Sequence, residues 1–193
     1  MKLFAKSLFL VLALSLAQAA FAQRQTFTVN PDASQVGFGL NATGHRVQGT
    51  FHVQSGSIQF DAAAHTISGS IVVAASSGNS GDAGRDKKMN SEVLNSAQFA
   101  QISFEPKSFQ GALAPAGDSS LQVAGVFTLH GTPHDLTLPM QIHIDHGTMT
   151  AKGQFQVPFV QWGLKDPSIF VLKVAKQVDI DLNLSGTVAG ANE

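Results

Sequence analysis

The densest group of reactive side chains is the segment from Ser80 to Met89 and the few residues that follow it. Only 13% of the 193 residues are charged. Yet this one short region holds the charged side chains Asp82, Arg85, Asp86, Lys87, Lys88 and Glu92. A cluster of this kind is either a solvated face or a polar rim at a binding site, and the residues alone leave both readings open.

Hydrolysis by a serine nucleophile is the first chemistry to consider for this segment, because Ser80 lies between Gly78 and Gly81. A nucleophile elbow requires the spacing Gly-x-Ser-x-Gly on a turn between a strand and a helix of an α/β fold. Here Asp82 stands where the second glycine should be, and no α/β pattern surrounds the segment. We therefore do not expect a serine hydrolase. For the chain as a whole we predict no catalytic residue and no enzyme.

Metal binding is the second chemistry to consider, because the chain has seven histidines. His143 and Asp145 share a strand face, but it is the polar face, opposite Ile142 and Ile144. His130 and His134 bracket a turn and lack the helical spacing of a zinc site. Cysteine is absent. We expect no metal and no cofactor.

The elements that must position these residues are β-strands, since apolar residues alternate with polar ones through most of the chain. Strands are predicted over 26–41, 46–54, 56–61, 66–75, 99–106, 120–130, 135–145, 148–157, 169–174 and 176–188. A single helix is predicted over 82–95, with Asp82 as its N-cap and with Met89 and Val93 on its apolar side. So many antiparallel strands must stack as two sheets or close into a barrel.

Glycines on the apolar faces of the strands favour a closed barrel. Gly49, Gly69, Gly125, Gly153 and Gly186 each lie between apolar residues of one face. A glycine inside a strand marks a bend or a close approach to the backbone. Inward glycines could also leave part of the lumen unfilled, so we expect a cavity. The 14 phenylalanines and the absence of tyrosine suit an apolar wall.

The N-terminus has the pattern of an export signal, with Lys2 and Lys6, an apolar run, and a small-x-small site ending at Ala22. We predict that residues 1–22 are a cleaved signal peptide; an uncleaved anchor is the alternative. Residues 23–193 would then form one domain with ten basic and thirteen acidic residues, a formal charge of −3. This charge does not suit nucleic acid, which we exclude as a partner.

Four segments together resemble the YceI-like family of exported lipid-binding proteins. They are Val36-x-Phe38 with Gly44-His45-Arg46-Val47-x-Gly49-x-Phe51, the Ser80–Met89 segment, Val126–Leu136, and Trp162–Ser168. The resemblance implies an all-β fold: an extended antiparallel, lipocalin-like β-barrel of about eight strands with one short helix. It also implies an apolar cavity for a polyisoprenoid or similar long amphiphile, a location in the periplasm, and no established catalytic activity.

The chain departs from the family pattern at two places. Ala100 stands where members commonly have proline, and Phe159 lies where many carry an arginine ahead of the aromatic-glycine pair. Loss of that positive charge weakens the case for a phosphorylated head group. A neutral or weakly polar amphiphile, such as an isoprenoid quinone or a fatty amide, therefore fits the sequence equally well.

The predicted ligand-binding residues form three groups. The wall comprises Phe38, Phe51, Phe104, Phe127, Phe155 and Trp162, the lid comprises Met89 and Leu94, and the mouth comprises Arg85, Asp86 and Lys88. The predicted function is that of a periplasmic lipid carrier. A stress-response or structural module without a ligand is the alternative, followed by a lipid-modifying enzyme. The sequence leaves open a membrane-associated donor or acceptor of the lipid, and a homodimer.

Overall fold

The computed structural model describes residues 24–190, so the predicted signal peptide lies outside the described residues. The strands are β1 (Gln25–Val29), β2 (Gln35–Ala42), β3 (His45–Phe51), β4 (Val53–Asp61), β5 (Thr66–Ala74), β6 (Gln101–Gln110), β7 (Gly117–Leu129), β8 (Thr132–Asp145), β9 (Thr148–Val157) and β10 (Val178–Gly190). The helical elements are α1 (Ala83–Lys88) and the short turns η1 (Pro31–Ala33), η2 (Ala75–Ser77) and η3 (Met89–Val93). None of the helices described is long and apolar enough to cross a membrane.

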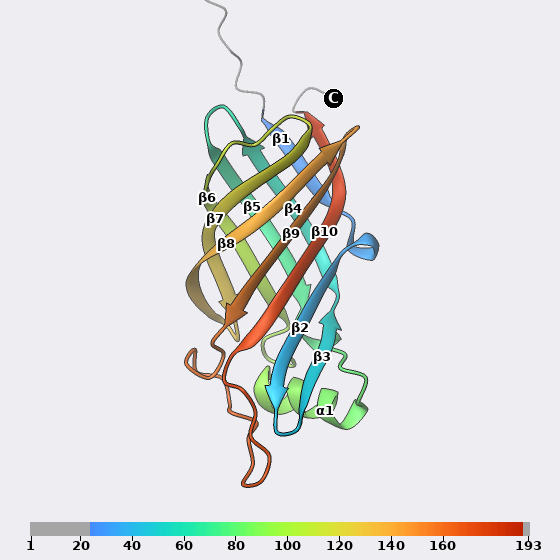
Figure 1. The fold of residues 1–193 in the computed structure, drawn as a ribbon, viewed down its shortest axis with the longest axis vertical. Coiled ribbons are helices and arrows are strands. Elements are labelled where there is room, and N and C mark those ends of the chain that lie inside the picture. The colour runs from blue at the N-terminus through green and yellow to red at the C-terminus, as the bar shows by residue number, and fades with distance from the viewer. Residues whose placement is uncertain (1–23, 191–193) are drawn as a thin grey trace, which may run out of the picture.

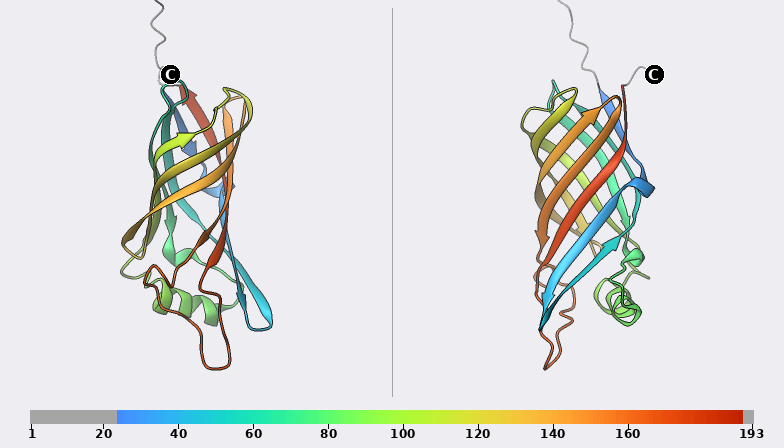
Figure 2. Two further views of the ribbon diagram at one scale, coloured as in Figure 1. Left: turned by 60° about the vertical axis from the view of Figure 1, so that its left-hand side comes forward. Right: turned by 45° about the vertical axis from the view of Figure 1, so that its right-hand side comes forward.

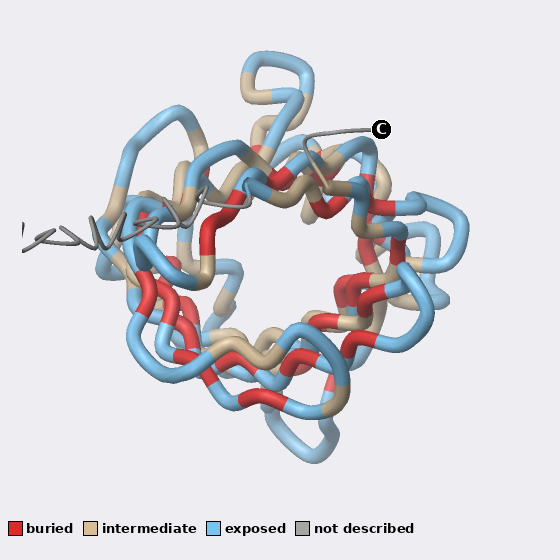
Figure 3. The backbone as a smooth tube through the Cα atoms, turned by 90° about the horizontal axis from the view of Figure 1, so that it is seen from above, coloured by how far each residue is buried: buried red, intermediate tan, exposed pale blue. Residues whose placement is uncertain are grey.

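Eight antiparallel strands close the barrel (Figure 1). They follow the order β1, β4, β5, β6, β7, β8, β9 and β10, and β1 pairs with β10 to complete the ring. Figure 3 views this ring end-on. The predicted all-β barrel of about eight strands with one short helix is confirmed.

The β2–β3 hairpin extends the barrel wall at the helix end of the molecule (Figure 2). It can do so because two successive parts of the same edge of β10 pair with two different strands. Residues 186–190 of β10 pair with β1, whereas residues 179–183 pair with β2. Among the described residues, the far edge of β3 makes one bridge, in which Thr50 and Asn79 exchange two backbone hydrogen bonds of 2.9 Å. The segment that carries α1 thus borders the open edge of β3.

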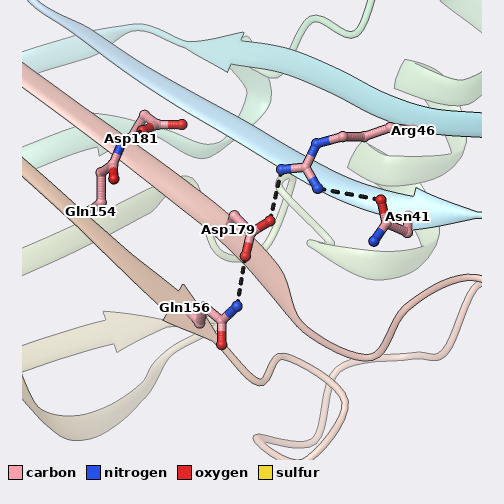
Figure 4. A network of polar contacts seen from close by, with 6 residues as sticks. All are labelled: Asn41, Arg46, Gln154, Gln156, Asp179 and Asp181. Atoms are coloured by element: carbon pink, nitrogen blue, oxygen red, sulfur yellow. Dashed lines mark hydrogen bonds and ion pairs between the residues drawn. The ribbon is translucent and has the colours of Figure 1, made fainter.

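Polar side chains on the outer surface tie this hairpin to the barrel (Figure 4). The Arg46 guanidinium donates to Asp179 at 2.7 Å and to Asn41 at 3.3 Å, and Gln156 donates to the same Asp179 at 2.8 Å. Arg46 reaches Asp179 by passing over Gly39, where a Cβ would lie 3.1 Å from the arginine Cζ. The network therefore links β2, β3, β10 and β9.

Two predicted strands are wrong, and the strand predicted over 46–54 runs across the break between the end of β3 at Phe51 and the start of β4 at Val53. The strand predicted over 26–41 is divided by η1, because Pro31 cannot donate to a ladder and the Asn30 side chain accepts hydrogen bonds from the amides of Asp32 and Ala33. The segment 169–174 forms a loop between β9 and β10, with one isolated bridge from Val174 to Ala42. The apolar composition of this segment is typical of a strand, but no neighbouring strand pairs with it along its length.

Rings from neighbouring strands occupy the space beside several barrel glycines. A Cβ at Gly49 would lie 2.5 Å from the Phe38 ring, one at Gly125 would lie 2.7 Å from Phe104, and one at Gly186 would lie 2.9 Å from a Phe27 ring atom. At each of the three positions a backbone carbonyl oxygen would lie closer still. Each glycine is therefore a place where an aromatic side chain packs against backbone. The expectation that these glycines leave space unfilled is wrong at these positions, because phenylalanine fills it.

Candidate ligand-binding cavity

The barrel interior holds one large cavity at the end covered by α1, with a volume of about 660 Å³. Strands β2, β3 and β5–β10 supply its wall, and the segments around α1 and the β9–β10 loop supply its rim. The wall is apolar because the alternating strands direct their apolar residues inward. A cavity of this size lies within the range of about 300–1,000 Å³ that is typical of small-molecule sites.

The predicted wall residues, with one exception, line this cavity. Phe38, Phe51, Phe104, Phe127 and Phe155 all contribute to its surface. The rings of Phe38 and Phe51 lie 5.2 Å apart in a tilted pair, and those of Phe127 and Phe155 lie 6.1 Å apart edge to face. Such geometries are favourable for aromatic pairs. The rings thus support one another as well as facing the empty space.

Trp162 does not line the cavity. It lies in the loop after β9, with its ring 5.9 Å from Phe127 and stacked on His134 at 3.9 Å and 6°. Phe127 does line the cavity, so Trp162 acts on it indirectly, as support for a wall residue. A residue with this role is hard to separate from a wall residue by sequence, because both are aromatic and both neighbour the same strands.

The predicted lid residues Met89 and Leu94 line the cavity from the helical segment. Asp82 caps α1 as predicted, accepting a hydrogen bond from the Arg85 amide at 2.8 Å, and this bond lowers the pKa of the Asp82 carboxyl. The helix is shorter than predicted, since residues 89–93 form a π turn in which the Leu94 amide donates to the Met89 carbonyl at 2.8 Å. A π turn places residues five apart on one side, which suits Met89 and Leu94.

Gly78 permits the close contact between the lid and the barrel wall. A Cβ there would lie 2.7 Å from the Phe51 ring and would also collide with the Met89 methyl group. The absence of a side chain at Gly78 therefore allows Met89 and Phe51 to meet above its backbone.

The predicted mouth residues have different roles. The Asp86 carboxylate accepts from the Ser80 amide at 2.9 Å and from the Ser80 hydroxyl at 2.5 Å, and Asp86 does not line the cavity. Arg85 donates to the Ser80 hydroxyl at 2.7 Å and to the Ser80 carbonyl at 3.0 Å, and it does line the cavity. Lys88 also lines it, and among the described residues it forms no ion pair. Asp86 orders the segment, whereas Arg85 and Lys88 face the cavity.

The polar groups do not form a catalytic arrangement or a metal site in the part of the chain that the structure describes. The Ser80 hydroxyl is bonded to Asp86 and Arg85, and no histidine bonds to it in residues 24–190. Over the same residues, no three His, Asp or Glu side chains lie close enough to hold a metal ion. His143 instead pairs with Asp118 on the barrel surface, at 2.7 Å.

Sequence reasoning missed the β9–β10 loop as part of the site. Pro167, Ile169, Leu172 and Val174 line the cavity from this loop. Lys165 in the same loop pairs with Glu92 beside the lid at 2.6 Å, which lowers the pKa of the Glu92 carboxyl. The signal for a loop was present in Asp166-Pro167-Ser168, where the Asp166 side chain accepts from the Ser168 amide at 2.9 Å.

Four residues form a floor between the large cavity and a smaller void of about 90 Å³ deeper in the barrel. Ile71, Phe104, Leu138 and Leu182 line both spaces. Beyond this floor, Phe27, Phe60 and Phe109 are buried and fill the barrel. The interior is thus open at the helix end and packed at the other.

Comparisons with known proteins agree with this architecture. A crystal structure of BcnA from Burkholderia cenocepacia is similar at a TM-score of 0.66 and 21% identity, covering 82% of this chain and 99% of that one. A polyisoprenoid binding domain from Saccharophagus degradans, implicated in plant cell wall breakdown, has a TM-score of 0.63 and 14% identity, covering 84% and 98%. A YceI protein from Campylobacter jejuni has a TM-score of 0.52 and 15% identity, covering 72% and 81%.

These identities are low, so the solved structures establish a shared fold. No curated protein matches the chain in sequence. A family model does: the model described as the YceI-like domain matches residues 27–186, from β1 through most of β10. The match spans the whole barrel, its cavity and its lid, and the chain therefore belongs to the YceI-like domain family.

Proposed function

We propose that this protein binds one isoprenoid-type lipid, or a similar long amphiphile, in the 660 Å³ cavity and carries it through the periplasm. The observation that carries the proposal is the cavity itself: an apolar chamber covered by the helical segment that contains Met89 and Leu94, with basic side chains at its rim. The polyisoprenoid binding domain of similar fold supports the choice of ligand class. The export-type N-terminus supports the location, and we propose no enzymatic activity.

The apolar tail of the ligand would lie along the wall. Removing its surface from water is favourable by about 25 cal/mol per Å², which supplies most of the affinity. Phe38, Phe51, Phe127 and Phe155 would contact the tail, and Phe104 would meet its end at the floor. Trp162 would hold Phe127 in place. Such a wall has few hydrogen-bonding groups, so selectivity for the tail would rest on its length and shape.

The polar head would lie at the rim beside Arg85 and Lys88. Both are donors, and an oxygen-rich head group is an acceptor. The carbonyl oxygens of a quinone or a fatty amide meet this requirement without a phosphate. Asp86 would act indirectly, by holding Ser80 and the start of the helical segment. Met89 and Leu94 would close over the ligand, and flexible methionine suits a surface that must adapt.

The proposal is tested by purifying the protein from the periplasm and identifying extracted lipids by mass spectrometry. The expected result is a stoichiometric isoprenoid-type amphiphile, together with a mature N-terminus at Gln23. Repeated recovery of protein without lipid, and without uptake of long-chain probes, would contradict the proposal. A mature chain that retains Met1 would contradict the signal-peptide assignment alone.

The lid gives a matched pair of variants for the same assay. Met89→Asp combined with Leu94→Asp places two carboxylates against the apolar cavity, so lipid retention should fall while the β-sheet circular dichroism persists. Ser91→Asp adds the same group on the exposed side of the same segment and should retain lipid. Equal retention by both variants would remove the lid from the mechanism.

A structural module without a ligand would require a filled barrel. The open cavity argues against this alternative. Consequently, the carrier proposal is the one that accounts for the empty, apolar half of the lumen.

A further inference from the structure

The tip of the β9–β10 loop exposes three consecutive apolar residues. Ile169, Phe170 and Val171 have 60%, 94% and 75% of their surface accessible, and they are the large exposed hydrophobic side chains of the described chain. The loop reaches beyond the end of the barrel, next to the β2–β3 hairpin and α1 (Figures 1 and 2). A contiguous apolar tip on an exported barrel is unfavourable in water, and it marks an interaction site.

The loop backbone is tied down on both sides of this tip. The Ile169 amide donates to the Leu172 carbonyl at 2.9 Å, and the Val174 amide donates to the Ser168 hydroxyl at 3.0 Å. Lys173 and Thr43 exchange hydrogen bonds of 2.9 Å between their backbone and side-chain groups, which joins the loop to the β2–β3 hairpin. The tip is therefore presented in a fixed turn.

Charge is distributed unevenly between the segments at the cavity mouth and the rest of the described chain. The segments 82–92 and 165–176, which border the cavity mouth, hold six lysine or arginine residues and four acidic residues, a net charge of +2. The rest of the described chain holds four basic and eight acidic residues, a net charge of −4. Lys173 and Lys176 follow the apolar tip in the same loop, and Lys176 also lies 4.0 Å from the Asp166 carboxylate. The mouth end thus suits an anionic partner that also has an apolar interior.

We propose that this end of the molecule docks on a membrane that contains anionic phospholipid. Phe170 and Val171 insert at the boundary between head groups and acyl chains, and Lys173 and Lys176 contact lipid phosphates. Ile169 and Leu172, from the same loop, line the cavity. Docking therefore brings the cavity entrance to the lipid surface, and a lipid tail can enter without crossing water. This purpose rests on the proposed function, whereas the docking itself does not.

A second copy of the chain fits this surface less well than a membrane does. In a two-fold dimer each patch faces its own copy, so two basic mouth ends would meet and repel. An anionic lipid surface satisfies both the lysines and the apolar tip.

The test is co-sedimentation of the full mature protein with two kinds of vesicle. One contains phosphatidylcholine alone, and the other contains phosphatidylcholine and anionic phosphatidylglycerol in a ratio of roughly seven to three. Binding should be strong only to the mixed vesicles and should fall as salt rises. Phe170→Ser removes a side chain that is 94% exposed, so the fold should persist while vesicle binding is lost.

The lysines provide a charge-matched comparison. Lys173→Gln with Lys176→Gln should weaken binding by about five-fold for each lysine removed. Lys107→Gln with Lys152→Gln removes the same charge from the barrel strands β6 and β9 and should change binding little. Equal loss in the two double variants, or no effect of Phe170→Ser, would overturn the docking surface.

Two further outcomes separate this inference from its rivals. A dimer in solution that Phe170→Ser dissociates, with no binding to either vesicle, would assign the tip to contact between copies and overturn the inference. Uptake of a soluble long-chain probe is measured without membranes. If the wild type binds vesicles but no probe, docking stands and the carrier function fails; if it binds the probe but no vesicle, the reverse holds.

Discussion

The two halves of this barrel are built from the same strands but have opposite interiors. At the end away from α1, Phe27, Phe60 and Phe109 are buried and leave a void of only about 90 Å³. At the end covered by α1, Phe127 and Phe155 are half-buried around a cavity of about 660 Å³. The alternation of apolar residues is the same in both halves, so alternation alone does not determine whether a lumen is filled.

The difference arises from how the wall closes. In the packed half, β1 lies between β4 and β10, and the ladder is continuous. In the cavity half, the β2–β3 hairpin replaces β1 along β10, and its far edge meets the loop at Asn79 through one bridge. The wall of this half is completed by a loop and a short helix, and these segments line the cavity. One half thus has a filled lumen, and the other holds the cavity in which we propose that the ligand binds.

The largest expected effect is a contrast between two phenylalanine truncations. Phe27→Ala in the packed half should cost about 3–5 kcal/mol of unfolding free energy, because it removes a fully packed ring and leaves a void. Phe155→Ala should cost less than half of that, since one side of its ring already faces the cavity. Urea unfolding of both variants measures the contrast. Equal costs would mean that the two halves are equally important for stability.

The next effect concerns the backbone contact at Gly186. Gly186→Ala would drive a methyl group into the Thr28 carbonyl and the Phe27 ring, and should cost about 1–3 kcal/mol. Gly190→Ala lies on the same strand with no atom near the added methyl, and should be neutral or slightly stabilising. Thermal unfolding of the pair provides the check. A tolerated Gly186→Ala would indicate that the packed half can relax.

A third effect bears on the boundary between the halves. Phe104→Ala removes the largest floor residue and should join the two voids, so that the cavity accepts a longer chain. Native mass spectrometry with amphiphiles of increasing chain length measures this shift. Phe127 lines the large cavity but not the smaller void, so Phe127→Ala is the control. It is expected to widen the site without lengthening it. The same length preference in both variants would contradict a dividing floor.

The smallest effect is electrostatic and belongs to the hairpin of the cavity half. Hydrogen bonds from Arg46 and Gln156, and the charge of Arg46, hold the pKa of Asp179 below its ordinary value of 3.8. A carboxyl whose pKa is lowered by folding stabilises the fold at every pH above its ordinary pKa. This stabilisation is lost as the pH falls through the lowered pKa. Both side chains of the pair are about 40% exposed, so it contributes about 0.2–1 kcal/mol.

Asp179→Asn should therefore lower stability slightly at pH 7 and have no effect once the pH lies below the lowered pKa of Asp179. Unfolding by urea across this pH range, with Asp181→Asn as a neighbouring control, gives the comparison. A difference between Asp179→Asn and wild type that persists unchanged into acid would show that the Arg46 pair is not its cause.

Much of the fold was predictable because strand alternation and family motifs agreed. The barrel, the single helix, the Asp82 cap and most wall residues follow from inward periodicity and turn residues. The residues that were placed wrongly depend on contacts that no local pattern encodes. Trp162 resembles a wall residue until its stacking on His134 is known, and Asp86 resembles a rim charge until its bonds to Ser80 are known.

The prediction of a strand over 169–174 failed for a different reason. Ile169, Phe170 and Val171 have strand-like composition, but a strand also needs a partner, and this is a property of the whole sheet. The glycines show the same limit. Periodicity identified them as inward positions, yet whether a ring fills the space beside each one depends on a residue from the adjacent strand.

The pairing of β1 with β10 has a mechanical consequence. Gln25 lies opposite Gly190, so both ends of the described chain lie together at the packed end (Figure 1). A force applied between these two points would load the β1–β10 hydrogen bonds one after another, as a zipper opens, and not all at once. The barrel should therefore yield at low force from its packed half, with the wall of the large cavity still intact when the first strand detaches.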